Sequence, residues 1–126
     1  MAAAQPHLVT NGEPNEADPP IGELLGSIAQ ELELARTIGL RVERAICAIA
    51  IQSTIDSALV AELQNFDAVL QHIAAMRDFS GELGRSCDAS WRTSPRAALE
   101  RVTLAEVKAR LGGEDTESTD ELWEIL

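Results

Sequence analysis

The sequence predicts an all-α protein built on a long antiparallel helical hairpin. Hydrophobic residues make up 45% of the 126 residues and aromatic residues only 3%. A core of Leu, Ile, Val and Ala is therefore expected, which suits packing of helix on helix better than a β-sandwich. Two stretches, 21–49 and 59–79, repeat apolar residues at alternating steps of three and four. That spacing is typical of amphipathic helices that lie side by side.

The first 20 residues are predicted to be disordered. They contain four of the five prolines and the turn dipeptide Asn11-Gly12, and they carry too few apolar side chains to offset the entropy of ordering. A hairpin or bundle domain is expected at 21–111, and an acidic linker with an amphipathic peptide at 112–126. The N-terminus lacks the pattern of a secretory signal, and no apolar run approaches the ~20 residues needed to cross a bilayer. A cytoplasmic location is expected.

The first helix should begin after Pro19-Pro20 and run for roughly 30 residues, about 45 Å at ~1.5 Å per residue. Gly39 could instead break it, because glycine costs about 1 kcal/mol relative to alanine in a helix interior. The small residues Ala35 and Gly39 would allow close approach of a partner helix. The heptad pattern that predicts this helix consists of Ile21, Leu25, Ile28, Leu32, Ala35, Gly39, Val42, Ile46 and Ile49.

A reversal is predicted at 52–57, where Ser53, Thr54 and Asp56 are suitable N-cap residues. The second helix follows, and its apolar run is Leu59, Leu63, Phe66, Leu70 and Ile73, continuing towards Met76 and Phe79. Two helices alone would leave too much apolar surface exposed. Either a second copy completes a four-helix bundle as a homodimer, or residues 95–111 cover the hairpin within a monomer.

The segment 80–96 contains two glycines and a proline and is interpreted as a loop or a frayed helix end. Ser94-Pro95 then indicates a helix start. Thr103 and Glu106 have the spacing of a capping box and Gly112 fits a helix stop, so a short third helix or two shorter ones are expected.

Composition excludes several classes of function. The formal net charge of −11 argues against nucleic acid and anionic membranes as partners and favours a basic protein surface. Cys47 and Cys87 are too few and too far apart for a disulfide framework or a zinc site, and Cys47 is expected in the core. Nothing in the sequence matches a Gly-rich phosphate loop, a nucleophile elbow or a metal cluster.

A polar row in "AELQNFDAVLQHIAAM" (61–76) is the main functional signal. Gln64, Asp67 and Gln71 follow one another at three and four residues, so a helix would place them on one face. The side chains around Gln71 are short, and this would let a partner approach its amide closely. They belong to Ala68, Ala74 and Ala75. A solvated helix face is the simpler interpretation. Asn65 and Arg77 are expected to be solvated.

The stretch "NFDAVLQHIAAM" resembles the motif helix of the CheZ family of response-regulator phosphatases, in which Asp and Gln lie four residues apart on a long helical hairpin. The acidic "GGEDTEST" followed by "DELWEIL" is similar to the linker and terminal peptide of that family. The chain is shorter than typical CheZ and more closely resembles compact CheZ-like proteins of alphaproteobacterial chemotaxis clusters, sometimes called CheT. The same spacing resembles one found in a class of sensor kinases, but Phe66 stands here where those kinases carry a phosphorylatable His.

The resemblance implies a role for each motif residue. Gln71 would orient the water that attacks the aspartyl phosphate of a CheY-like regulator, since its carboxamide can accept from the water and donate to the phosphoryl group. Asp67 would pair with the regulator's lysine. Gln64, Ala68 and Ala75 would contact the partner. The chain would need no cofactor of its own, because the regulator supplies Mg²⁺, and another chemotaxis protein could join the complex.

Two further features leave alternatives open. The terminal residues Leu122, Trp123, Ile125 and Leu126 would either dock on a partner or fold back on the chain's own bundle. In the first case the chain could be a non-catalytic adaptor for a chemotaxis or motility protein. His72 allows a third function, phosphotransfer, although "HIAAMR" lacks the Lys and small residue that usually follow a phosphorylated His.

Overall fold

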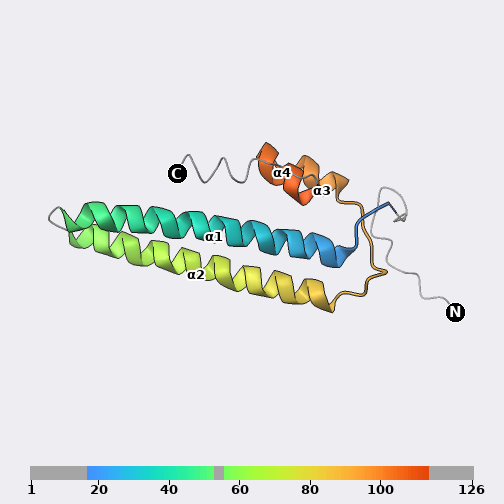
Figure 1. Cartoon of the computed structure of the whole chain (residues 1–126), viewed down its shortest axis with the longest axis horizontal. Helices are drawn as coiled ribbons and strands as arrows, with labels where there is room; N and C mark the ends of the chain where they lie inside the picture. Colours follow the sequence, from blue (N-terminus) through green and yellow to red (C-terminus); the bar gives the residue numbers. More distant parts are fainter. Residues whose placement is uncertain (1–16, 53–55, 114–126) are drawn as a thin grey trace.

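The computed structural model describes residues 17–52 and 56–113. Its elements are α1 (Ile21–Ile51), α2 (Ser57–Ser86), α3 (Arg96–Glu100) and α4 (Ala105–Leu111). Figure 1 shows α1 and α2 as a long antiparallel hairpin, with α3 and α4 on one side of it and α4 packed against α1. The described residues contain no strand beyond an isolated bridge between Pro20 and Arg92. The predicted all-α hairpin is confirmed.

Both long helices are continuous. α1 runs for 31 residues and passes through Gly39 without a break. Asp56 caps α2, because its Oδ1 accepts a hydrogen bond from the backbone N–H of Ala58 at 3.1 Å. α2 extends to Ser86, so residues 80–86 are the end of a helix, one of the two predicted alternatives, and the loop is confined to residues 87–95. Gly81 and Gly84 reduce helix propensity there, but both lie against α1, and this packing outweighs the propensity.

Glycines set how closely the two helices approach. A Cβ added to Gly22 would lie 2.6 Å from the carbonyl oxygen of Gly84, and one added to Gly84 would lie 2.8 Å from that of Gly22. In the middle of the hairpin, a Cβ on Gly39 would overlap Leu70 Cδ2. The backbones therefore meet at the open end of the hairpin, and α1 receives the Leu70 side chain at its centre.

The core of the described chain is thin. Among the described residues only Ala50 and Leu70 are buried hydrophobic residues, and no side chain is fully buried. Met76 is 54% exposed and Phe79 63% exposed, so the apolar run of α2 does not stay in the core beyond Ile73. The prediction that Cys47 is a core residue is also wrong, because its side chain is exposed. Two helices have one shared seam, and Cys47 lies outside it.

The link after α2 returns to the start of α1. The backbone N–H of Ile21 donates to the carbonyl of Trp91 at 2.7 Å, and that of Thr93 donates to the carbonyl of Pro19 at 3.4 Å. Residues 17–20, which the sequence placed in a disordered segment, are thus held against residues 91–93. Residues 1–16 lie outside the described residues.

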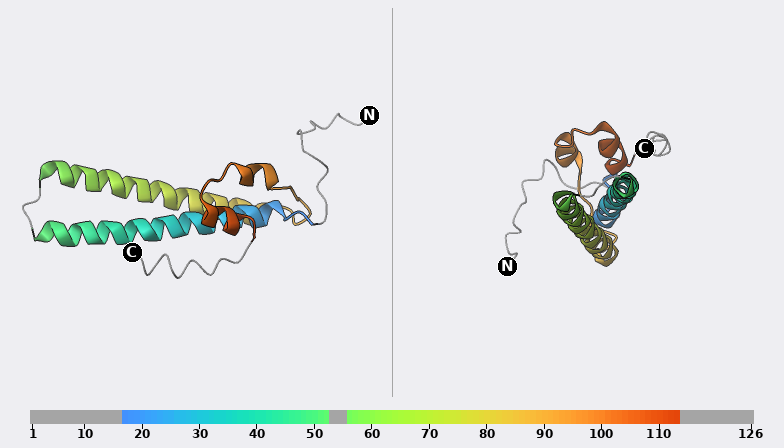
Figure 2. Two further views of the ribbon diagram at one scale, coloured as in Figure 1. Left: turned by 90° about the horizontal axis from the view of Figure 1, so that it is seen from above. Right: turned by 90° about the vertical axis from the view of Figure 1, so that its left-hand side faces the viewer.

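The short helices cover one end of the hairpin (Figure 2). Arg110 of α4 pairs with Glu31 of α1, and Arg110 Nη2 lies 3.1 Å from Glu31 Oε2. The predicted capping box at Thr103 is wrong: α4 begins at Ala105, with Leu104 at the N-cap and no side-chain cap. Gly112 follows the last residue of α4 as the C-cap, as predicted. Within the described ranges, no helix is long and apolar enough to cross a membrane.

Candidate functional site

The polar row of α2 lies on one exposed face of a continuous helix. Gln64, Asp67 and Gln71 are all exposed, and all belong to the regular part of α2. Their spacing of three and four residues places the side chains above one another along the helix. Asp67 and Gln71 follow directly after Phe66 and Leu70, which face α1, so the row lies beside the hairpin seam.

Asp67 and Gln71 are joined side chain to side chain. Gln71 Nε2 donates a hydrogen bond to Asp67 Oδ2 over a distance of 2.8 Å. A carboxylate has two acceptor oxygens, so Asp67 retains Oδ1 as an acceptor for a cation while it holds the amide. The bond fixes Nε2 towards the N-terminus of α2 and thereby directs the amide oxygen away from Asp67. The pair thus presents an anionic acceptor and a neutral acceptor next to each other.

Small side chains surround the pair. Ala68 and Ala75 are exposed, three residues before and four residues after Gln71, and Ala74 is half-buried. On a helix these positions are the nearest neighbours of Gln71. No long side chain therefore stands between Gln71 and a partner that approaches along this face.

The support for the pair comes from α1. Leu70 is 4% exposed, and its side chain packs against Gly39, with Phe66 Cζ also near the same glycine. These contacts fix the rotation of α2 about its axis at the turn that carries Asp67 and Gln71. A rigid helix fixes a side-chain position better than a loop would.

His72 is exposed and engaged by its own helix. Its Nδ1 lies 2.7 Å from the backbone carbonyl oxygen of Ala68. This contact requires the tautomer in which Nδ1 carries the proton and leaves Nε2 as the ring nitrogen able to react. The geometry is that of a histidine bonded to the preceding turn of its own helix.

Arg77 is not solvated, contrary to the prediction. Its side chain is half-buried and pairs with Glu33 of α1, and its Nε donates to Asp78 Oδ1 at 2.9 Å. The hydrogen bonds with Asp78 and then with Glu33 raise the pKa of Arg77 above its ordinary value, and the bond from Arg77 lowers the pKa of Asp78. This network ties the helices together one and a half turns beyond Gln71. Asn65 is exposed, as expected.

The remaining predicted site residues lie elsewhere. Leu122, Trp123, Ile125 and Leu126 are outside the described residues. Within residues 17–52 and 56–113 there is no group of three or more His, Cys, Asp or Glu residues that could hold a metal ion. Cys47 and Cys87 are free thiols.

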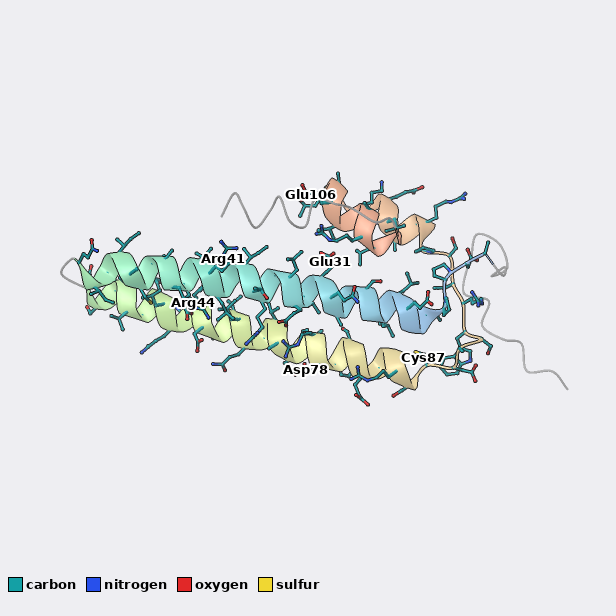
Figure 3. The ribbon with its side chains drawn as sticks, in the orientation of Figure 1. Glu31, Arg41, Arg44, Asp78, Cys87 and Glu106 are labelled. Atoms are coloured by element: carbon teal, nitrogen blue, oxygen red, sulfur yellow. The ribbon has the colours of Figure 1, made fainter. Side chains whose placement is uncertain are left out.

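A groove on α1 was not singled out from the sequence. It is lined by Arg41, Val42, Arg44, Ala45, Ile46 and Ile49. Figure 3 shows Arg41 on the same edge of α1 as Glu31, the edge along which α4 lies. A signal was present in the sequence: Arg41 and Arg44 flank Val42 within the apolar heptad run, and such a face combines positive charge with apolar surface.

One protein family matches the chain. A family model described as a domain of unknown function, DUF8776, matches residues 17–123. No curated protein and no solved structure matches the chain. The matched range includes both long helices, both short helices and most of the acidic C-terminal segment.

Proposed function

We propose that this chain, which belongs to the DUF8776 family, is a CheZ-like protein phosphatase acting on the aspartyl phosphate of a CheY-like response regulator. One observation carries the proposal: Gln71 and Asp67 are exposed on the same helix face and joined by a 2.8 Å hydrogen bond. An amide and a carboxylate held side by side on a rigid surface suit the positioning of a water and a lysine. The reaction would take place in the cytoplasm, where response regulators act.

The proposed chemistry is hydrolysis of an acyl phosphate. A water attacks phosphorus in line with the departing carboxylate oxygen of the regulator's aspartate, so that a bond from the water oxygen to phosphorus forms. The bond between phosphorus and the carboxylate oxygen breaks. Inorganic phosphate is released and the free carboxylate of the aspartate is regenerated; one proton of the water stays on the phosphate and the other passes to solvent. Such a loose transition state needs positioning more than covalent help.

Gln71 would provide that positioning. Its amide oxygen accepts a hydrogen bond from the attacking water, and the amide carries no charge that would repel the phosphoryl oxygens. Since Asp67 already holds Nε2, little rotamer freedom of Gln71 is lost when the regulator binds. Positioning of this kind can contribute orders of magnitude in rate without a general base.

Asp67 would bind the regulator's lysine through its second carboxylate oxygen. This contact sets the register between the two proteins and places Gln71 over the phosphoryl group. Ala68 and Ala75 allow the close approach, and Gln64, one turn before Asp67, lies at the rim of the contact. The formal net charge of −11 favours encounter with a basic surface around that lysine. Mg²⁺ would come with the regulator, and the proposal asks for no metal ligand from this chain.

The decisive experiment follows the decay of a phosphorylated regulator in the presence of the wild-type chain, of Gln71→Ala and of Gln30→Ala. Gln30 is an exposed glutamine on α1, so its variant controls for the loss of a surface amide. We expect Gln71→Ala to fold with an unchanged helical circular dichroism spectrum and to lose nearly all acceleration, while Gln30→Ala keeps it. Full acceleration by Gln71→Ala would refute the mechanism.

A non-catalytic adaptor is the second candidate. It is favoured by exposed apolar side chains on α2 away from the Asp67 face, namely Val69, Met76, Phe79 and Leu83. An adaptor would keep its function when Asp67 and Gln71 are substituted and would lose it when residues 113–126 are deleted. Phosphotransfer through His72 is a third candidate, and it predicts acid-labile phosphate on His72 after incubation with a kinase.

A further inference from the structure

The groove on α1 combines two properties that are rarely found together on this acidic chain. Arg41 and Arg44 supply positive charge, whereas Val42, Ala45, Ile46 and Ile49 supply apolar surface. Val42 is exposed and Ile49 is 68% exposed. The occupant that fits such a surface is an acidic amphipathic peptide, because it can pair its carboxylates with the arginines and bury its apolar side chains.

The chain carries such a peptide. Residues 114–126 contain six acidic residues and no basic one, and they end in the apolar side chains Leu122, Trp123, Ile125 and Leu126. The N-terminal 16 residues fit less well, since they contain two acidic residues and three prolines or glycines in place of an apolar cluster. The family model also continues through the acidic segment to residue 123, so this segment belongs to the domain that the family shares.

The position of α4 brings the peptide to the groove. Arg110 pairs with Glu31, which fixes the end of α4 on α1, and Gly113 is the last described residue. Arg41 lies ten residues beyond Glu31 along α1, a distance of about 15 Å at ~1.5 Å per residue. Ile49 lies eighteen residues beyond Glu31, a distance of about 27 Å. The following 13 residues could span about 20 Å as a helix and about 43 Å when extended. The peptide can therefore reach the whole groove.

We propose that the α1 groove is the docking site for the chain's own C-terminal peptide, residues 114–126. The tether of α4 makes the contact intramolecular, so its effective concentration is in the mM range and a weak contact is populated. The residues that line the groove all belong to α1, whereas Asp67 and Gln71 are on α2. This docking is therefore independent of the proposed phosphatase reaction, and either can fail without the other.

Trp123 provides a direct readout. The sequence contains two tryptophans, Trp91 and Trp123, so a Trp91→Phe background leaves Trp123 as the single fluorophore. In the full chain without any partner, we expect its emission to be blue-shifted and protected from acrylamide relative to the isolated peptide 114–126. Both effects should be independent of protein concentration, and 1 M NaCl should weaken them, because salt screens the arginine contacts.

Two matched variants locate the contact. Ile49→Glu places a carboxylate in the groove and should bring emission and quenching to the values of the free peptide. Ile51→Glu makes the same change at an 82% exposed isoleucine outside the groove and should change neither. Trp123 values equal to those of the free peptide in the unsubstituted chain would overturn the proposal. So would protection that appears only with rising concentration, which indicates a second copy, or only after a response regulator is added.

Discussion

Gly39 of α1 lies directly against the side chain of Leu70, the residue that precedes Gln71 in α2. A Cβ at position 39 would overlap Leu70 Cδ2, and Leu70 is buried, so it has little room to move. The contact explains why glycine, a residue of low helix propensity, lies near the centre of a 31-residue helix. It also links the backbone of α1 to the orientation of the turn that carries Asp67 and Gln71.

Replacing Gly39 with Ala should therefore destabilise the hairpin relative to an equivalent substitution elsewhere in α1. Gly26 is the matched control, because a Cβ there would meet nothing within 4 Å. Gly26→Ala should raise the free energy of unfolding by up to about 1 kcal/mol through helix propensity. The free energy of unfolding of Gly39→Ala should be lower than that of Gly26→Ala by about 1–3 kcal/mol, the usual cost of overpacking. Urea unfolding followed by circular dichroism measures both, and equal effects would show that the close approach is unimportant.

The same contact shows what the sequence could and could not predict. Apolar spacing was sufficient to predict α1, α2 and the reversal at Asp56, because helix periodicity is local. It was not sufficient to decide between a loop and a helix end for residues 80–86, since their glycines are accommodated by contact with α1 rather than by propensity. Arg77 was misjudged for the same reason: its partner Glu33 is 44 residues away in the sequence.

The candidate site was predicted better than the core. Asp67 and Gln71 fall on one exposed face because their spacing alone dictates it, and the hydrogen bond between them is a four-residue contact within a single helix. The exposure of Met76, Phe79 and Cys47 was not predictable in this way. Which apolar side chains are covered depends on where α3 and α4 pack, and α4 meets α1 through an ion pair between Arg110 and Glu31, which are far apart in the sequence.

Asp67→Asn should separate binding from catalysis. The Asn side-chain oxygen can still accept the hydrogen bond from Gln71, so the amide keeps its orientation, but the negative charge offered to the regulator's lysine is lost. We expect the KM for the phosphorylated regulator to rise about tenfold, which corresponds to about 1.4 kcal/mol, with kcat little changed. Steady-state phosphate release at several regulator concentrations gives both constants. A fall in kcat with an unchanged KM would assign Asp67 a different role.

The exposed apolar side chains of α2 predict a homodimer. Met76 and Phe79 are more than half exposed, and the described residues contain only two buried hydrophobic side chains. A hairpin with so thin a core is expected to pair with a second copy into a four-helix bundle. Light scattering should therefore give twice the chain mass of 13.6 kDa. The double variant Met76→Ser, Phe79→Ser should give the monomer mass, whereas a wild-type monomer would contradict the prediction.

Removing the side chain of Arg110 should release α4 from the hairpin. The paired carboxylate of Glu31 raises the pKa of Arg110, so the guanidinium is charged throughout the accessible pH range, and Arg110 and Glu31 are both largely shielded from solvent. Arg110→Ala leaves the Glu31 carboxylate without its cation, which should cost about 1–3 kcal/mol.

Amide hydrogen exchange measures the release of α4. Because α4 has seven residues and no side-chain cap, it is too short to persist alone. Exchange across residues 105–111 should therefore accelerate while α1 and α2 remain protected. Lys108→Ala, an exposed cation on the same helix, is the matched control and should leave exchange unchanged. Equal exchange in the two variants would mean that contacts other than the ion pair hold α4 in place.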